Sequence, residues 1–158
     1  MRLNLIVALL ACGALAACAS TPEPPPQTVS GTMKPYTIRG KTYTPRHDPG
    51  YDEVGLASWY GGKHHGRMTA DGEIFDMNAP SAAHKTLPLP SIVEVKNLEN
   101  GRKIKVRVND RGPFADGRII DLSKEAARQL GMLEQGLAKV RVKYVGPAER
   151  KSRKVARR

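Results

Sequence analysis

Cysteine and long apolar runs are both scarce in this sequence. Only two of the 158 residues are cysteine, Cys12 and Cys18, and both lie close to the N-terminus. The apolar stretch at residues 3–17 is too short to cross a bilayer comfortably. It follows the positively charged Arg2, which is the arrangement of a signal peptide rather than of a transmembrane helix.

The N-terminal segment indicates export and lipid attachment. Leu15-Ala16-Ala17-Cys18 has the pattern of a lipobox, where bacteria acylate the cysteine and cleave just before it. An ordinary secretory peptide cut near Ala17 is the alternative, and lipidation at Cys12 would leave a very short apolar region. With Cys12 removed and Cys18 acylated, no thiol remains for a disulfide, a metal site or a nucleophile. By resemblance to Gram-negative lipoproteins, Ala19 and Ser20 suggest the outer membrane, facing the periplasm.

Acidic residues are outnumbered, with 15 Asp and Glu against 26 Lys and Arg and a formal net charge of +11. The last ten positions hold six basic residues and one acid, so this tail alone carries +5. A basic tail of this kind adheres to polyanions such as nucleic acid, anionic lipid or acidic envelope polymer. Export excludes nucleic acid, which leaves a lipid surface or an envelope polymer as the partner.

Four segments are predicted along the chain. Residues 1–17 are the signal peptide with its lipobox, and residues 18–50 are the lipidated cysteine and a Pro-rich linker, expected to be disordered. Residues 51–146 form one folded domain, and residues 147–158 form the basic, disordered tail. Within the linker, Tyr36, Ile38 and Tyr43 alternate weakly and suggest an edge strand.

The folded domain has the pattern of a small β-barrel. Residues 92–97 and 103–108 alternate apolar and polar side chains around the turn Glu99-Asn100-Gly101, which predicts a β-hairpin. Further strands are expected at residues 54–60, 118–120 and 138–144, and Ser123 is expected to cap a helix at residues 124–130. Many short strands and one or two short helices in one domain favour a mainly β, six-stranded barrel.

Three polar clusters interrupt this pattern, at residues 63–73, 81–84 and 109–114. In a β protein, strand ends and their loops are the usual place for functional side chains. His64 and His65 suggest a metal site, but no carboxylates lie at ligand spacing, so we predict no metal and no cofactor.

These clusters carry a resemblance to a known family. The segments Gly55-Leu-Ala-Ser-Trp-Tyr-Gly61, Thr69-Ala-Asp-Gly-Glu73, Ala82-Ala-His84, Asn109-Asp-Arg-Gly-Pro-Phe114 and Ile120-Asp-Leu-Ser123 resemble the rare lipoprotein A family in order and spacing. The resemblance implies a double-psi β-barrel, a lipoprotein of the bacterial cell envelope, and endolytic peptidoglycan lytic transglycosylase activity. This enzyme cleaves MurNAc–GlcNAc bonds and leaves 1,6-anhydroMurNAc ends. A monomer that contacts peptidoglycan glycan strands is expected.

The same resemblance implies that Glu73, His84 and Asp110 are catalytic. Glycosidic cleavage needs a carboxylic acid that protonates the leaving oxygen. A lytic transglycosylase needs no external water, so one carboxyl can act first as acid and then as base. We assign this role to Asp110, with Glu73 in support; the reverse assignment stays open. His84 would orient a carboxyl or bind the sugar. Glu73 and Asp110 should therefore face one groove, within about 10 Å of each other.

The substrate-binding candidates are Trp59, Tyr60, Thr69, Arg111 and Asp121. Trp59 and Tyr60 offer flat faces for pyranose rings, although either can equally belong to the core. Asp121 precedes a helix N-terminus, where a carboxylate is stabilised in a purely structural role. Two other functions compete with the enzyme: an expansin-like module that binds glycan without cleaving it, and a lipoprotein that tethers the outer membrane to the wall.

Overall fold

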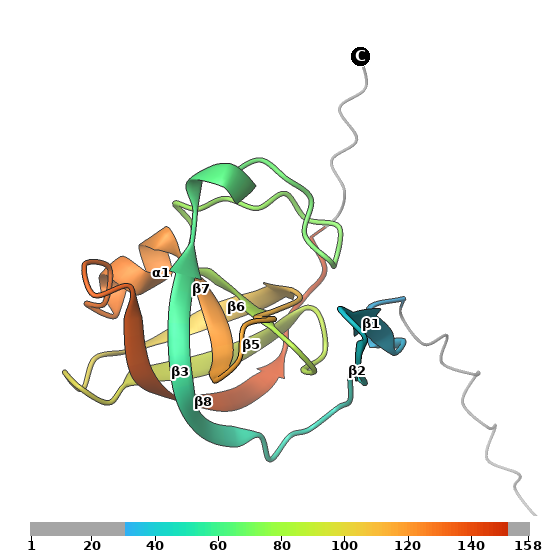
Figure 1. The fold of residues 1–158 in the computed structure, drawn as a ribbon, viewed down its shortest axis with the longest axis horizontal. Coiled ribbons are helices and arrows are strands. Elements are labelled where there is room, and N and C mark those ends of the chain that lie inside the picture. Colours follow the sequence, from blue (N-terminus) through green and yellow to red (C-terminus); the bar gives the residue numbers. More distant parts are fainter. Residues whose placement is uncertain (1–30, 152–158) are drawn as a thin grey trace, which may run out of the picture.

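The computed structural model describes residues 31–151 (Figure 1). The predicted signal peptide, the lipidation site Cys18, the first part of the predicted linker and residues 152–158 of the basic tail lie outside these residues. Within the described part of the chain, no helix is both long enough and apolar enough to cross a membrane.

Six strands close into a barrel, which confirms the predicted fold class. Their order around the barrel is β3 (Asp52–Tyr60), β7 (Arg118–Ser123), β4 (Ser81–His84), β6 (Lys103–Asp110), β5 (Ser91–Asn97) and β8 (Leu137–Pro147). The pairs β3–β7 and β4–β6 are parallel, and all other neighbours are antiparallel. Closure leaves no free edge on the sheet, which removes the usual aggregation hazard of an open β-sheet.

The barrel interior is filled by aliphatic side chains that alternate along the strands. The fully buried members include Val93, Val95, Val106, Val108, Ile120, Leu122, Val140 and Val142. The predicted hairpin is present as β5 and β6, in antiparallel register. Its alternating pattern succeeds as a predictor because one face of each strand packs inside the barrel while the other meets solvent.

One short α-helix closes one side of the barrel. Helix α1 (Lys124–Gln129) begins at Ser123, whose hydroxyl accepts the backbone N–H of Ala126, as the sequence predicts. Two 3-10 turns, η1 (Gly31–Met33) and η2 (Gly62–His64), complete the helical content of the described residues. Ala126, Ala127 and Leu130 are fully buried against the barrel.

Residues 36–43 form a hairpin, whereas the sequence predicts a disordered linker with one weak edge strand. Strands β1 (Tyr36–Ile38) and β2 (Lys41–Tyr43) pair antiparallel in a two-stranded sheet of their own, rather than adding an edge strand to the barrel. Figure 1 shows this hairpin beside the barrel, joined to β3 by an extended segment. The hairpin bears on function because it borders the pocket described next.

Candidate active site

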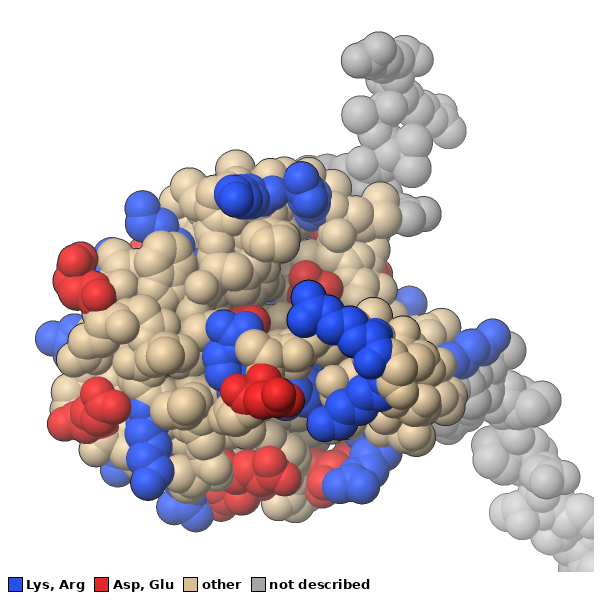
Figure 2. Space-filling view, in the orientation of Figure 1, with Lys and Arg blue, Asp and Glu red and all other residues tan. Residues whose placement is uncertain are grey.

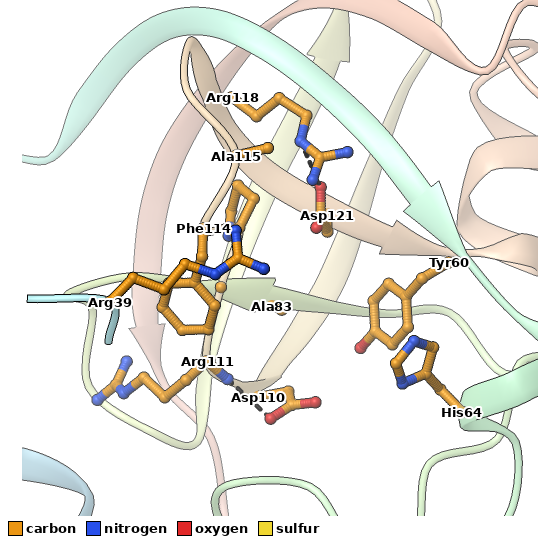
Figure 3. A pocket seen from close by; sticks show the side chains of 12 residues that line it. Arg39, Tyr60, His64, Ala83, Asp110, Arg111, Phe114, Ala115, Arg118 and Asp121 are labelled. Carbon is orange, nitrogen blue, oxygen red and sulfur yellow. Dashed lines mark hydrogen bonds and ion pairs between the residues drawn. The ribbon is translucent and has the colours of Figure 1, made fainter. Parts of the chain in front are cut away.

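A pocket of about 420 Å³ opens on the barrel beside the β1–β2 hairpin (Figure 3). On the face shown in Figure 2, basic and acidic side chains gather around a hollow between the barrel and the hairpin. Twelve residues line the pocket: Arg39, Tyr60, His64, Ala83, Asp110, Arg111, Gly112, Pro113, Phe114, Ala115, Arg118 and Asp121. Four of the predicted site residues are therefore in the pocket, namely Asp110, Tyr60, Arg111 and Asp121.

The floor of the pocket lies where β6, β4 and β7 run side by side. Ala83 of β4 is in register with Asp110 of β6 on one side and with Asp121 of β7 on the other. Residues paired across neighbouring strands project to the same face, so the two carboxylates flank the Ala83 methyl group, as Figure 3 shows. Two strand spacings, roughly 10 Å, separate their backbones. The small side chain between them leaves room for a ligand.

Asp110 has the electrostatic setting of a proton donor. Its Oδ1 accepts the backbone N–H of Ala70 at 2.9 Å and that of Arg111 at 2.8 Å. No described residue donates a hydrogen bond to Oδ2. Burial raises the pKa of Asp110, the two backbone hydrogen bonds oppose this rise, and the neighbouring Asp71 adds to it. One oxygen is fixed in place, while the other is free to carry a proton.

Asp121 is held at the pocket wall by partners on two strands. The Ser58 hydroxyl donates to its Oδ1 at 2.5 Å, and the Arg118 Nε lies 3.6 Å from the same oxygen. Arg118 also donates to the Ser58 hydroxyl at 2.7 Å. These contacts hold Asp121 in place, and Asp121 also lines the pocket.

Glu73 does not line the pocket with Asp110, so the expectation that both carboxyls face one groove is wrong: Glu73 is closed in an ion pair instead. Arg107 Nε donates to both of its carboxylate oxygens, at 3.0 and 3.1 Å, and Arg107 Nη2 makes a further contact with Oε1. Asn109 Nδ2 donates to Oε2 at 2.9 Å. Burial alone would raise the pKa of Glu73, but the hydrogen bonds from Arg107 and Asn109 outweigh it and lower the pKa. With its side chain only 12% exposed, Glu73 is an ionised anchor in this arrangement.

His84 is also outside the pocket, with 3% of its surface exposed. Its Nδ1 accepts the backbone N–H groups of Thr86 and Leu87, at 3.2 and 3.1 Å, and its Nε2 lies 2.9 Å from the Tyr51 hydroxyl. Because Nδ1 is an acceptor, the ring proton belongs on Nε2. Burial, assisted by the charges of Arg111 and Lys85, lowers the pKa of His84 to about 3. His84 is thus a neutral ring that fixes the turn after β4.

The two aromatic candidates at the end of β3 have different surroundings. Tyr60 lines the pocket, and its ring stacks on Phe75 with centroids 4.4 Å apart. Its hydroxyl is buried without a hydrogen-bond partner among the described residues, and burial raises its pKa, as do Asp110 and Asp121. Trp59 instead packs against the core and donates its Nε1 hydrogen to the Leu133 carbonyl at 3.1 Å.

The remaining candidates, Thr69 and Arg111, organise loops. The Thr69 hydroxyl is placed to donate to Asp71 Oδ1 at 2.8 Å and to the Glu73 carbonyl at 3.1 Å, which closes the turn that carries Ala70. Arg111 Nη1 donates to the carbonyls of His84 and Leu87, at 3.1 and 2.7 Å. Among residues 31–151, no group of three or more His, Cys, Asp or Glu side chains is arranged to hold a metal ion.

Comparison with known proteins shows to which family this barrel belongs. Residues 52–142 match the protein family described as lytic transglycolase. The chain belongs to this family. It is 53% identical over 131 residues to the endolytic peptidoglycan transglycosylase RlpA of Pseudomonas aeruginosa, a match that covers 81% of this chain and 38% of that protein. The protein of the same name from Vibrio cholerae is 54% identical over 116 residues, which are 73% of this chain and 44% of the relative.

The resemblance to the rare lipoprotein A family is thereby confirmed. The chain spans less than half the length of these two relatives. Among solved structures, the Streptomyces papain inhibitor is similar with a TM-score of 0.52 and 28% identity, covering 63% of this chain and 99% of that one. An expansin of Clavibacter michiganensis in complex with cellohexaose has a TM-score of 0.51 and covers 64% of this chain and 54% of its own. At 19% identity, this second likeness shows the double-psi fold alone.

Family motifs did not reveal every lining residue. Arg118 is the first residue of β7, three residues before Asp121 in the same strand, and this spacing is the only signal in the sequence that connects it with the site. Arg39 lies outside the residues that match the family. The only local signal was the turn dipeptide Arg39-Gly40, and nothing in the sequence connects that turn with the barrel.

Proposed function

We propose that this barrel is an endolytic peptidoglycan lytic transglycosylase with Asp110 as its acid and base. The observation that carries the proposal is the Asp110 carboxyl in the pocket, with Oδ1 fixed by two N–H groups, Oδ2 unpartnered among the described residues, and its pKa raised. The names of the two RlpA relatives support the substrate and the reaction.

The proposed reaction uses one proton twice. Protonated Asp110 gives its proton to the oxygen of the MurNAc–GlcNAc bond as the bond from that oxygen to the muramic C1 breaks. The C6 hydroxyl of the same muramic residue then bonds to C1, and the Asp110 carboxylate takes its proton. The products are a 1,6-anhydroMurNAc end and a GlcNAc with a free C4 hydroxyl. A raised pKa suits the first step, because it keeps the acid protonated closer to neutral pH.

Glu73 and His84 act in this scheme as positioning residues. Glu73 belongs to the turn whose Ala70 N–H contacts Asp110, and its ion pair with Arg107 ties that turn to β6. His84 fixes the turn at residues 84–87, whose carbonyls hold the Arg111 side chain next to Asp110. Removal of either side chain should therefore loosen the hydrogen bonds that aim the Asp110 carboxyl.

Digestion of purified sacculi tests the proposal. We expect wild-type protein to release fragments with anhydro ends, measured by mass spectrometry, and Asp110→Asn to release none. Asp116→Asn is the matched control, since Asp116 is an exposed acid of the following loop that does not line the pocket. Fragments with reducing ends would make the protein a hydrolase, and binding without any product would favour the expansin-like or tethering function.

We also propose that Cys18 anchors the protein to the outer membrane. Cys18 lies outside the described residues, so the support is the lipobox pattern together with a family that acts on an envelope polymer. Labelled palmitate should be incorporated by the wild type in cells and absent from Cys18→Ser. Membrane fractionation should then recover the variant in the soluble periplasmic fraction. Equal labelling of both proteins would reject lipidation at this cysteine.

A further inference from the structure

The β1–β2 hairpin is fastened to the barrel at several points. Tyr36 donates its hydroxyl hydrogen to the Lys85 carbonyl at 2.8 Å, and the rings of Tyr36 and Tyr43 pack on Phe114 with centroids 6.2 and 5.5 Å away. Just before the hairpin, the Thr32 carbonyl accepts a hydrogen bond from Arg111 Nη2 at 2.6 Å. The hairpin is therefore a fixed wall of the pocket.

The tip of this wall holds an arginine in an unfavourable conformation. Arg39 and Gly40 form the two-residue loop between β1 and β2, with φ values of 50° and 77°. Arg39 is the only non-glycine residue with positive φ in the described chain. Such loops prefer Asn, Asp or Gly at the first position, because other side chains strain the left-handed conformation. A strained residue at the edge of a pocket is a reason to look for a binding role.

Arg39 differs from the other arginines of the pocket in having no hydrogen-bond or ion-pair partner among residues 31–151. Arg111 is bound to three backbone carbonyls, and Arg118 is bound to Ser58 and Asp121. Arg39 makes no hydrogen bond or ion pair with any described residue, although Asp110 and Asp121 line the same pocket. Figure 3 shows its guanidinium extended over Phe114 toward the pocket.

We infer that Arg39 binds a carboxylate of the substrate, which makes the hairpin a specificity wall of the active site. This inference rests on the proposed function. The guanidinium matches a carboxylate in planar, two-point geometry. Peptidoglycan offers that group from two sources: the lactyl ether of muramic acid, where no stem peptide is attached, and the stem peptides themselves. Neutral polymers such as chitin offer neither.

Binding of prepared glycan strands tests this inference without interference from turnover. All proteins carry Asp110→Asn, so that no substrate is cut. Three ligands are compared: peptide-free strands with free lactyl carboxylates, the same strands with those carboxylates converted to methylamides, and strands that retain their stem peptides. The test variant is Arg39→Asn, because asparagine suits the left-handed turn position and removes the charge without straining the hairpin. Lys34→Ala, an exposed cation before the hairpin, is the matched control.

We expect Arg39→Asn to weaken binding of a carboxylate-bearing strand by about ten-fold or more, and binding of the methylamide strand hardly at all. Arg39→Lys should recover part of the loss, and Lys34→Ala should change nothing. Loss confined to peptide-free strands assigns the lactyl carboxylate, and loss confined to peptide-bearing strands assigns the stem peptide. Equal loss on the charged and methylamide strands, or no loss on any strand, overturns the role of Arg39 and leaves the proposed function standing. If the parent binds none of the three ligands, the proposed function falls together with this inference.

Discussion

Two opposing effects act on the carboxyl of Asp110. Its partly buried site disfavours the charged form, while the N–H groups of Ala70 and Arg111 favour it. The balance is a raised pKa, and the carboxylate of Asp71 contributes to it. If protonated Asp110 is the active form of the free enzyme, kcat/KM should fall as the pH rises through that pKa.

Asp71→Asn should move this fall in kcat/KM, the alkaline limb of the pH profile, to lower pH. The substitution removes a negative charge that favours the protonated form of Asp110, so the proton leaves Asp110 more readily. Asparagine keeps an oxygen to accept the hydrogen bonds from Thr69 and from the backbone of Glu73. The measurement is the rate of anhydro-end formation between pH 4 and pH 9, with Asp116→Asn as the charge control. A limb that stays in place would remove Asp110 from the role of titrating acid.

Glu73→Gln should separate positioning from proton transfer. The ion pair with Arg107 is largely buried, with side chains 12% and 14% exposed, and loss of one partner from such a pair costs about 3 kcal/mol. We expect urea unfolding to show a destabilisation of that order and turnover to fall. The alkaline limb of activity should persist and should not move to lower pH, because Glu73 is not among the groups that shift the pKa of Asp110 directly and a looser Ala70 N–H contact would only raise that pKa. Disappearance of the limb would make Glu73 the acid.

The pH dependence of the same variant has a defined sign. The pKa of Glu73 is lowered in the folded protein, so its ionised form contributes stability above the ordinary glutamate pKa, and that contribution is lost as the pH falls through the lowered value. The difference in unfolding free energy between wild type and Glu73→Gln should therefore be full at neutral pH and should shrink in acid. A constant difference would mean that the charge of Glu73 contributes nothing.

At the scale of elements, one buried hydroxyl joins helix α1 to the start of β4. Ser123 Oγ accepts the backbone N–H groups of Ala126 and Ser81, and it donates to the Ala79 carbonyl at 2.7 Å. Ser123→Ala removes a helix cap and leaves buried backbone groups unpaired, so we expect a destabilisation of about 2 kcal/mol. Thermal and urea unfolding measure it.

A second buried serine provides the control for Ser123. Ser91 is also fully buried, but its hydroxyl has no hydrogen-bond partner among the described residues. Ser91→Ala should leave the stability nearly unchanged or raise it slightly, because it removes an unpaired polar group from the core. Equal losses for the two variants would show that packing, and not the hydrogen bonds, governs the Ser123 effect.

Some elements were predictable from local pattern and others were not. The β5–β6 hairpin, β8 and α1 follow from alternation, a turn signal and a cap, because one face of each element is buried and the other is not. Strand β3 does not alternate in this way, since its first three residues are exposed and Ala57 and Ser58 are buried in succession. Strand β4 has no alternation of buried and exposed residues, because all four of its residues are buried. The sequence therefore predicts only a polar cluster at Ser81–His84. The sequence predicts only a linker with a weak edge strand where the β1–β2 hairpin lies, since the hairpin is stabilised by ring contacts with Phe114, far along the chain.

The candidate site is likewise only partly predictable from the sequence. Motif resemblance found Asp110 and Asp121, which are in register with Ala83 on neighbouring strands. It could not reveal that Glu73 and His84 lie outside the pocket, because that depends on how the loop of Glu73 folds against β6 and on which way His84 faces at the end of β4. Asn109 and Asp110 illustrate the point: they are consecutive, yet Asn109 contacts Glu73 whereas Asp110 lines the pocket. A shift of one residue in register would exchange their surroundings.

Across the whole sequence, positive charge is concentrated in the last ten residues. The last ten residues carry +5 of the net charge of +11, while the barrel mixes both signs, as Figure 2 shows on one face. Sacculi carry carboxylates on their stem peptides and muramic residues. Attraction between exposed charges of opposite sign weakens as added salt shortens the Debye length from about 10 Å at 0.1 M to about 3 Å at 1 M.

Truncation after Glu149 should therefore weaken binding to purified sacculi at low salt and make no difference at 1 M salt. The cut keeps all twelve residues that line the pocket, and the Glu149 oxygen that accepts a hydrogen bond from Arg107 stays present as part of the new C-terminal carboxylate. Cleavage of short soluble glycan fragments should proceed at the wild-type rate, because these need no tethering to the wall. A tail with the same residues in scrambled order should restore binding if charge alone is responsible. If the truncated protein binds low-salt sacculi as tightly as the full chain, wall affinity belongs to the barrel and its pocket, and the tail has another partner.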